Sequence, residues 1–455
     1  MKKAIICLLF TISVIQFNYG QIKKFGKVTK DDFNESSIPS FNDANAVIIF
    51  KERKSHFDHQ NERWVLITEV HERIKISNKE GFDYANKSIK LFTQNNRDES
   101  VRIKANTYNI VDNKVVKTKL RKKNIYKKVQ NKFWSTKSFT MPNLKEGSIV
   151  EWIYTITSPF YMNLNDVVFQ SDIPTKIYSA KIRIPEYFIF NTEVNKYNRT
   201  TIKNSKKNRT LMYSYTKMET STGRAPHEVK HSYEISFAEK IFEIELSNIK
   251  PLIEESYVNN INNYRGKVIF ESVGTQFPNS IHESFSATWN EVTKSIYTSS
   301  KFGVELNKKK YFKDDLTKIL NESKSTNDKI SVILKFVKDK IKWNNFYGIR
   351  TSDGVSKAYK NGFGNVAEIN LILTAMLREA GLDASPVLVS TRSNGIPLFP
   401  TIEGFNYVIA GVELDNEIVL LDATEPFSAP NVLPSRVLNW QGRILENMDL
   451  RHLLI

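Results

Sequence analysis

The stretch Asn361-Gly-Phe-Gly-Asn-Val-Ala-Glu-Ile-Asn370 leads into a largely apolar run from Leu371 to Ala380, and Gly381 follows directly. A glycine after a run of this length is typical of the C-terminus of a helix. The apolar run is long enough for a helix and carries charged side chains only at its end. The sequence therefore predicts a core helix over residues 366–380.

Further helices are predicted before this stretch, and strands after it. One helix begins at Thr288 and Trp289, and a second begins near Asn327. The second places one apolar stripe on a single face, formed by Ile330, Ile333, Leu334, Val337 and Ile341. The predicted strands are 384–391, 407–413 and 417–421, the last two joined across Asp415-Asn416. Helices packed on an antiparallel sheet define an α+β fold.

Three short segments of this region resemble the core of transglutaminase-like domains in the papain-like cysteine proteinase superfamily. In that family a Gly-x-Cys turn begins the core helix, where the helix N-terminus helps to lower the pKa of the thiol. The matching residue here is Val366, or Asn365 if the register differs by one. Phe405-Asn-Tyr-Val-Ile409 resembles the strand that carries the general-base histidine, with Tyr407 in its place. Only Asp422, in Leu420-Leu-Asp-Ala-Thr424, is retained.

The resemblance therefore implies a degenerate transglutaminase-like domain over residues 265–440, in which the catalytic Cys and His are replaced. A tyrosine with a pKa near 10 is a poor general base at neutral pH. Tyr407 could still donate a hydrogen bond to Asp422 and preserve the family's geometry. Alternatively, Asp422 caps a turn through its own hydrogen bonds.

Three residues are candidates for the lining of the former cleft. Trp343, with the neighbouring Phe346 and Tyr347, is expected to form one wall. Glu368 and Asn370 lie about one helical turn from the nucleophile position, where they could bind polar groups of a peptide or glycan. Equally, they could be exposed residues of the first helical turn, where the helix dipole favours an acid.

The region 45–250 is predicted to form strands. The expected strands include 46–52, 64–76, 101–110 and 114–120, with a hairpin turn at Asp112-Asn113. The stretch 139–158 predicts a strand with Val150, Trp152 and Tyr154 on one face. It resembles a domain of unknown function that precedes transglutaminase-like cores in secreted bacterial proteins. The resemblance and the strand pattern predict an antiparallel β-sandwich-like domain.

The N-terminus reads as a secretion signal over residues 1–20, with Lys2 and Lys3 ahead of the apolar stretch 4–15. The single cysteine, Cys7, lies inside it, so the mature chain would hold no thiol. No later stretch approaches the roughly 18 apolar residues of a spanning helix. A periplasmic or extracellular location, possible association with the outer membrane, and no nucleic-acid partner are expected.

The formal net charge is +17. It allows salt-sensitive contacts with an anionic envelope surface, or it serves solubility alone. The segments 117–132 and 196–209 are basic runs without acidic residues. They predict solvated loops or protected strand edges.

The segment His227-Glu-Val-Lys-His231 matches the H-E-x-x-H zinc-peptidase pattern, which requires a helix that brings both imidazoles to one ion. The following Ser-Tyr-Glu-Ile-Ser-Phe alternates with the period of a strand, in which the two residues would lie about 13 Å apart. His56 and His59 could bind metal adventitiously, but their polar surroundings predict solvated histidines in a loop.

The prediction from sequence is an exported, non-catalytic transglutaminase-like protein, without metal or cofactor, that binds or scaffolds a peptide or glycan. The alternative is a hydrolase, acting either through zinc at His227 and His231 or through carboxylates at the former cleft.

Overall fold

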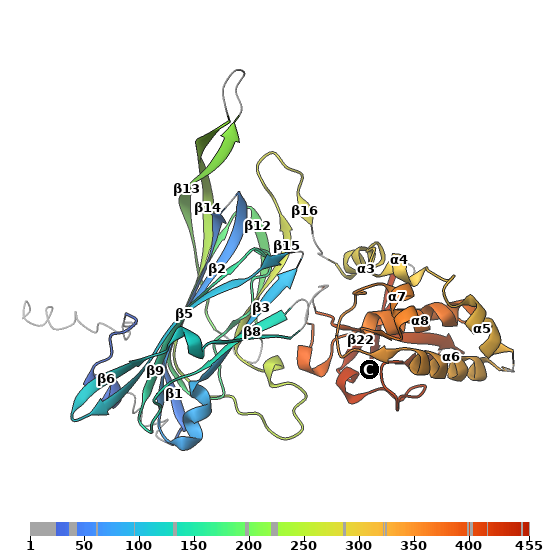
Figure 1. Ribbon diagram of the computed structural model, residues 1–455, viewed down its shortest axis with the longest axis horizontal. Helices are drawn as coiled ribbons and strands as arrows, with labels where there is room; N and C mark the ends of the chain where they lie inside the picture. The colour runs from blue at the N-terminus through green and yellow to red at the C-terminus, as the bar shows by residue number, and fades with distance from the viewer. Residues whose placement is uncertain are drawn as a thin grey trace, which may run out of the picture. The chain divides into compact units, whose positions relative to one another are not determined.

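The computed structural model describes residues 24–35, 43–60, 62–94, 96–130, 134–195, 200–219, 226–284, 288–321, 323, 325–397, 400, 404–415, 417–446 and 449–454. The predicted signal segment 1–20 with Cys7, Asn416 of one predicted turn, and parts of both basic runs lie outside these residues. Helices and many strands both occur, so the α+β class is confirmed (Figure 1).

The chain divides into two compact units. Unit 1 comprises Met1–Ile253 and Arg265–Ser272, and unit 2 comprises Glu254–Tyr264 and Val273–Ile455. The prediction began the second domain at residue 265, but Arg265–Ser272 belong to unit 1. The reason is strand β15 (Lys267–Thr275), which pairs with β10 (Val167–Val168) in a small sheet of order β10-β15-β12. Strand β12 is Phe188–Val194, and β16 (Glu283–Ser284) pairs with β15 off this path.

Unit 1 is built on an eight-stranded sheet. Its order is β13 (Lys203–Glu219), β14 (His227–Ile249), β11 (Thr175–Pro185), β1 (Ala46–Gln60), β2 (Arg63–Ile76), β9 (Ile149–Ser158), β5 (Ser100–Val111) and β6 (Lys114–Lys119). Strands β1 and β11 pair in parallel, whereas the sequence predicted antiparallel strands throughout. A parallel pair needs a long crossover, and more than a hundred residues separate these two strands.

A four-stranded sheet covers one face of the large sheet. Its order is β4 (Arg97–Asp98), β3 (Asn86–Gln94), β8 (Trp134–Thr140) and β7 (Tyr126–Val129). Ile89 and Leu91 of β3 share a buried core with Val150 and Trp152 of β9. Glu151 lies on the other face of β9, as the alternation of the sequence predicted.

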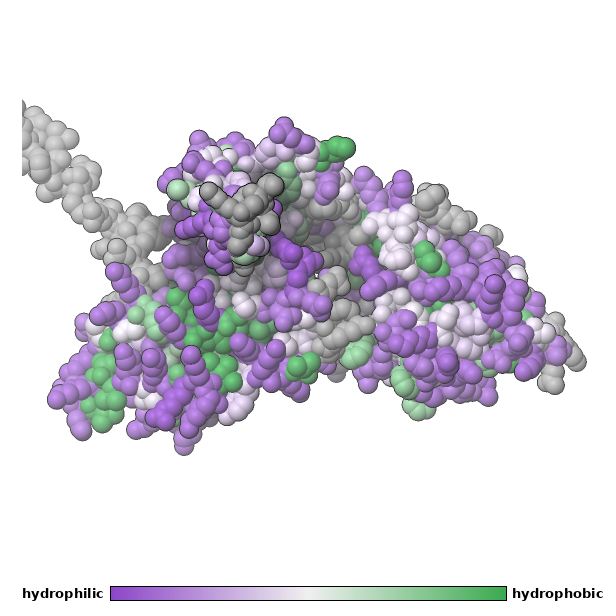
Figure 2. All heavy atoms as spheres, turned by 45° about the horizontal axis from the view of Figure 1, so that its top comes forward, coloured by the Kyte–Doolittle hydropathy of each residue, from purple (hydrophilic) through white to green (hydrophobic). Residues whose placement is uncertain are grey.

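The basic runs lie largely on edge strands. Strands β6 and β13 are the two edges of the eight-stranded sheet, and β7 is an edge of the four-stranded sheet β4-β3-β8-β7. Lysines at an edge discourage pairing with other chains, so the prediction of protected edges is confirmed for the described parts. The face of the protein in Figure 2 is largely hydrophilic, with smaller hydrophobic patches.

The described helices also include the short α2 (Lys30–Glu35) of unit 1 and short 3-10 turns at Lys79–Ala85, Lys122–Asn124, Ile261–Asn263, Arg392–Asn394 and Ser435–Val437. None of the described helices is long and apolar enough to cross a membrane.

Unit 2 places helices against a five-stranded antiparallel sheet. The strand order is β21 (Glu417–Leu421), β20 (Tyr407–Leu414), β19 (Ala384–Val389), β22 (Gln441–Glu446) and β23 (Asp449–Leu454). The helices are α3 (Trp289–Tyr297), α4 (Gly303–Leu306), α5 (Lys313–Leu320), α6 (Thr326–Lys340), α7 (Val355–Asn361) and α8 (Val366–Glu379). The two-residue strands β17 (Lys342–Trp343) and β18 (Phe363–Gly364) pair in parallel ahead of α8.

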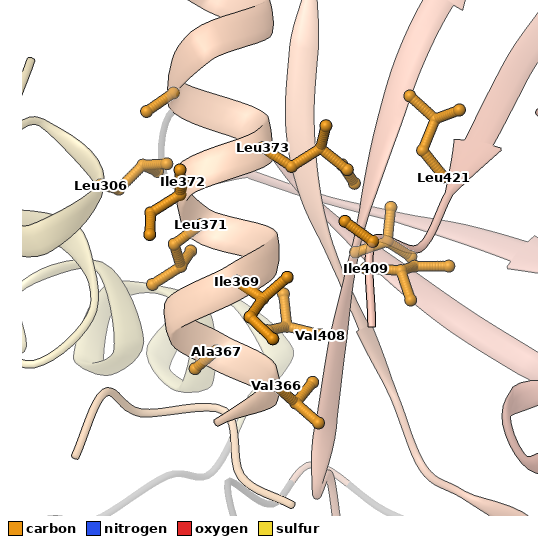
Figure 3. Close-up of a cluster of buried hydrophobic side chains, with 14 of the residues drawn as sticks. Leu306, Val366, Ala367, Ile369, Leu371, Ile372, Leu373, Val408, Ile409 and Leu421 are labelled. Atoms are coloured by element: carbon orange, nitrogen blue, oxygen red, sulfur yellow. The ribbon is translucent and has the colours of Figure 1, made fainter. Parts of the chain in front are cut away.

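Helix α8 is the centre of unit 2. It packs on β19 and β20 with one side and on α4, α6 and α7 with others. Every residue from Val366 to Leu377 is buried, which explains why most of these residues are apolar whichever side of the helix they lie on. In Figure 3 Ile369 and Leu373 are directed toward the strands, whereas Leu306 of α4 lies on the opposite side. Gly381 ends the helix with φ +83°, so the predicted helix and its stop are confirmed.

Candidate functional site

Val366 is the first residue of α8 and is fully buried. Asn365 precedes it as the helix cap: its side chain accepts a hydrogen bond from the Glu368 amide at 2.8 Å. The Glu368 carboxylate accepts one from the Asn365 amide at 2.8 Å, which completes a capping box. Two reciprocal hydrogen bonds between Asn365 and Glu368 therefore fix the start of the helix. The side chain at its first position is a hydrocarbon that cannot act as a nucleophile.

Glu368 does not line a groove, and it is not an exposed first-turn acid either. It is 2 % exposed, and its Oε1 accepts hydrogen bonds from the amides of Ser352, Asp353 and Gly354 at 2.8, 2.6 and 3.1 Å. With the amide of Asn365, its carboxylate satisfies four backbone donors. Both readings of Glu368 from sequence are therefore wrong. This carboxylate fixes the loop that precedes α7 against the beginning of α8.

Asn370 is also buried, with no exposed surface. Its amide nitrogen donates to the carbonyl of Val408 at 2.9 Å and to Asp422 Oδ1 at 3.0 Å. Its oxygen accepts from the amide of Ala423 at 2.9 Å. Asn370 therefore connects α8 to β20 and to the segment after β21. The expectation that it lines a ligand groove is wrong, because its polar atoms are all used inside the protein.

Tyr407 and Asp422 lie together. The Tyr407 hydroxyl donates to Asp422 Oδ2 at 2.8 Å and lies 2.6 Å from Thr424 Oγ1. Asp422 Oδ1 accepts from the amide and hydroxyl of Thr424 at 2.9 and 2.7 Å. Neither Tyr407 nor Asp422 is exposed. With the bond from Asn370, both carboxylate oxygens are occupied by protein donors.

Arg436, in the turn Ser435–Val437 (η6), completes the cluster, and nothing in the sequence drew attention to it. Its Nη2 donates to Thr424 Oγ1 at 2.9 Å and its Nη1 to Glu425 Oε2 at 3.0 Å. Its Nε approaches the Tyr407 hydroxyl at 3.3 Å. The guanidinium also lies over the ring of Trp343, 4.6 Å from its centroid. A loop arginine of this kind carries no local sequence signal.

Trp343 and Tyr347 form an aromatic wall beside this cluster. The ring centroids of Trp343 and Tyr347 are 5.4 Å apart, and those of Tyr347 and Tyr407 are 5.8 Å apart. The Trp343 indole donates to the carbonyl of Phe346 at 3.2 Å, which fixes its orientation. Phe346 and Tyr347 are 36 % and 44 % exposed. The wall therefore combines partly exposed aromatic rings with the buried ring of Tyr407.

The electrostatics of the cluster keep Tyr407 protonated. Burial raises the pKa of the Tyr407 hydroxyl, and Asp422 raises it further, against the smaller opposing influence of Thr424 and Arg436. A general base must lose its proton near the operating pH, which this phenol cannot do. Asp422 cannot replace it, because its oxygens are enclosed and already hydrogen-bonded. The cluster is suited to holding loops in place.

The H-E-x-x-H segment lies on strand β14, as the alternating pattern predicted. His227 and His231 pair in register with Glu219 and Tyr215 of β13. His231 Nε2 is 2.8 Å from Glu219 Oε1, and the ring of His231 stacks on Tyr215. Two residues four apart on a strand are about 13 Å apart, so they cannot hold one zinc ion. The zinc-peptidase alternative requires both histidines on one helix, and it is wrong because they lie on a strand.

The other metal candidates are equally unsupported. Within the residues that the structure describes, no group of three or more His, Cys, Asp or Glu side chains is placed to hold a metal ion. His56 and His59 lie on strand β1, which extends to Gln60, so the prediction that they belong to a loop is wrong. His59 packs against the rings of Trp64 and Tyr213 at 5.5 and 4.3 Å.

The comparison with solved structures supports the fold alone. The protein is similar to the crystal structure of a "putative protease" from Parabacteroides distasonis, with a TM-score of 0.56 and 10 % sequence identity. The similarity covers 86 % of this chain and 72 % of that one. No family model and no curated protein matches the sequence. These findings support a mixed α+β fold similar to that of this structure.

Proposed function

We propose that this protein is an exported, degenerate transglutaminase-like protein that binds a peptide or glycan without cleaving or cross-linking it. The observation that carries the proposal is the state of Tyr407, at the position where the family has its histidine. Its hydroxyl is a buried, protonated donor to Asp422, locked further by Thr424 and Arg436. Val366, at the position of the nucleophile, has no reactive atom.

Ligand binding does not need the lost groups. The wall formed by Trp343, Phe346 and Tyr347 keeps partly exposed aromatic surface beside Arg436, which is itself partly exposed. Aromatic faces and a guanidinium together suit the backbone and side chains of a peptide or the ring of a sugar. The proposed export is supported by the signal-like pattern of the N-terminal sequence.

The carboxylate-based hydrolase is the weaker candidate. It would need a carboxylate with an oxygen free to activate water at the former cleft. Asp422 is fully enclosed, and Glu368 is bonded to four amides. The fold similarity to a protein described as a protease does not restore these groups.

The proposal can be tested with two measurements on the purified mature protein. Peptides selected from a random displayed library should bind in calorimetry, and Trp343→Ala should weaken binding about tenfold or more. A matched control, Trp440→Ala, changes a 53 % exposed tryptophan outside this wall and should leave the affinity unchanged. Cleavage of a selected peptide, or amine incorporation into casein, that disappears in Tyr407→Phe would refute the non-catalytic proposal.

A further inference from the structure

A second polar cluster lies inside unit 1. It follows one row across the large sheet. Tyr178 of β11 is the register partner of Lys51 of β1, Lys51 is the partner of Glu72 of β2, and Glu72 is the partner of Trp152 of β9. Neighbouring strands lie about 4.8 Å apart, so these four side chains are neighbours on one face. Trp152 shares a buried core with Ile89 and Leu91 of β3, so this face packs against the four-stranded sheet β4-β3-β8-β7.

Glu72 is already neutralised by another lysine. Lys87 of β3 lies 3.0 Å from Glu72 Oε2, and the indole nitrogen of Trp152 donates to the same oxygen at 3.0 Å. Lys87 also lies over the Trp152 ring, 5.1 Å from its centroid. One carboxylate is thus matched by one ammonium before Lys51 is considered.

Lys51 has no such match. Among the residues that the structure describes, no acceptor lies within hydrogen-bond or ion-pair distance of its ammonium. Its surroundings are mostly positive: burial lowers the pKa of Lys51, Glu72 opposes this, and Lys87, Arg53 and Arg265 lower it further. Arg53 donates to the carbonyls of Asn165 and Asp166 at 2.8 and 2.6 Å, which leaves its charge without a bonded carboxylate.

Two more donors in this neighbourhood lack an acceptor. Within the described part of the chain, the hydroxyl of Tyr178, a residue that is 1 % exposed, has no hydrogen-bond partner, and neither has the buried Nε of Arg265. A buried donor without a partner costs about 1–3 kcal/mol. The neighbourhood therefore combines several cations with two buried donors that lack an acceptor, the Tyr178 hydroxyl and the Arg265 Nε, and with the partly exposed ammonium of Lys51.

We propose that Lys51, Tyr178 and Arg265 form a binding site for a phosphate or similar tetrahedral oxyanion in unit 1. Such an anion offers several acceptor oxygens and supplies the negative charge that the protein lacks here. The site is not sealed, because Lys51 and Arg265 are intermediate in exposure and the Lys87 side chain is 24 % exposed. The anion could arrive as a free ion or as a phosphate group on a sugar.

Calorimetric titration with inorganic phosphate at low ionic strength tests the site. The unmodified protein should bind one phosphate per chain, and Lys51→Met should weaken binding at least tenfold. Tyr178→Phe removes only the hydroxyl and should weaken binding severalfold. The matched control is Lys54→Met on the same strand, since the Lys54 side chain is 51 % exposed and already pairs with Glu52 at 2.8 Å. This control should bind as the unmodified protein does.

Thermal unfolding gives an independent readout. Without phosphate, Lys51→Met should melt at a higher temperature than the unmodified protein, because it removes one of several positive charges that lie close together. Phosphate should raise the melting temperature of the unmodified protein and of Lys54→Met, but not that of Lys51→Met. Glucose 6-phosphate that binds at least tenfold more tightly than inorganic phosphate identifies a sugar phosphate as the source, and equal affinity identifies the free ion.

Absence of saturable phosphate binding, or equal binding by the unmodified protein and Lys51→Met, overturns the proposal. The peptide-binding proposal for unit 2 does not depend on this outcome.

Discussion

Replacing Tyr407 with Phe removes one oxygen from the interior of unit 2 and tests whether the phenol is structural. The Asp422 carboxylate would lose the donor at 2.8 Å, and no water can replace it because neither residue is exposed. A hydrogen bond to a charged group contributes about 1.5–3 kcal/mol. The contact with Arg436 Nε at 3.3 Å is longer and adds little. Thr424 Oγ1, which lies 2.6 Å from the hydroxyl, keeps its own bonds to Asp422 and Arg436. We therefore expect the free energy of unfolding of unit 2 to fall by about 2–3 kcal/mol.

Because the chain has two units, hydrogen exchange by mass spectrometry is the assay of choice. The opening free energy of amides in α8 and β20 should fall by the stated amount, while those in β1 and β2 stay unchanged. Tyr347→Phe is the matched control, since this tyrosine is 44 % exposed, and its effect should stay within about 0.5 kcal/mol. A loss below about 0.5 kcal/mol for Tyr407→Phe would refute the structural role of the phenol.

Three further perturbations probe other parts of the structure. Asn370→Ala removes three hydrogen bonds at 2.9–3.0 Å in the core and should lower the free energy of unfolding of unit 2 by about 3 kcal/mol or more, measured by urea denaturation; an unchanged denaturation midpoint would contradict the proposed link between α8 and β20. Glu368→Gln replaces one carboxylate oxygen, an acceptor for backbone amides, with an NH2 group that can only donate. It should lower the free energy of unfolding of unit 2 by about 1–3 kcal/mol and speed the hydrogen exchange of the amides at 352–354. Unchanged slow exchange at these amides would show that the carboxylate is dispensable. Burial lowers the pKa of His56, and the charges of Arg183 and Arg209 lower it further. The His56 imidazole therefore binds a proton more readily in the unfolded chain than in the folded one, so its contribution to the stability of unit 1 falls as the pH drops below about 6.5. His56→Asn should make that decline shallower in denaturation curves at pH 7 and pH 5, and parallel declines would rule the histidine out.

The local elements were largely predictable. The apolar run after Val366 and the glycine at position 381 predicted α8, and the β-branched stretches predicted β20 and β21 within a residue or two. The alternation in Ser232–Phe237 predicted a strand and argued against the zinc pattern. These signals work because they depend on neighbours along the chain.

Partners distant in sequence were less predictable. The bond from Tyr407 to Asp422 was considered because the family resemblance brings these positions together. Arg436 was missed, since a loop arginine becomes part of the cluster only when β20 and η6 meet in space. The parallel pairing of β1 and β11 depends in the same way on a crossover of more than a hundred residues.

By itself, the sequence determined several helices and strands, among them α8, β20 and β21, and that no thiol lies beyond Cys7, because these properties are local or compositional. Only the tertiary structure decided the roles of the polar residues. Glu368 and Asn370 are both polar residues near the start of α8, and the sequence does not distinguish their roles. In the structure Glu368 accepts hydrogen bonds from the loop before α7, whereas Asn370 donates one to strand β20. Burying a polar group costs free energy unless a partner is supplied, and only the fold determines which distant atoms supply it.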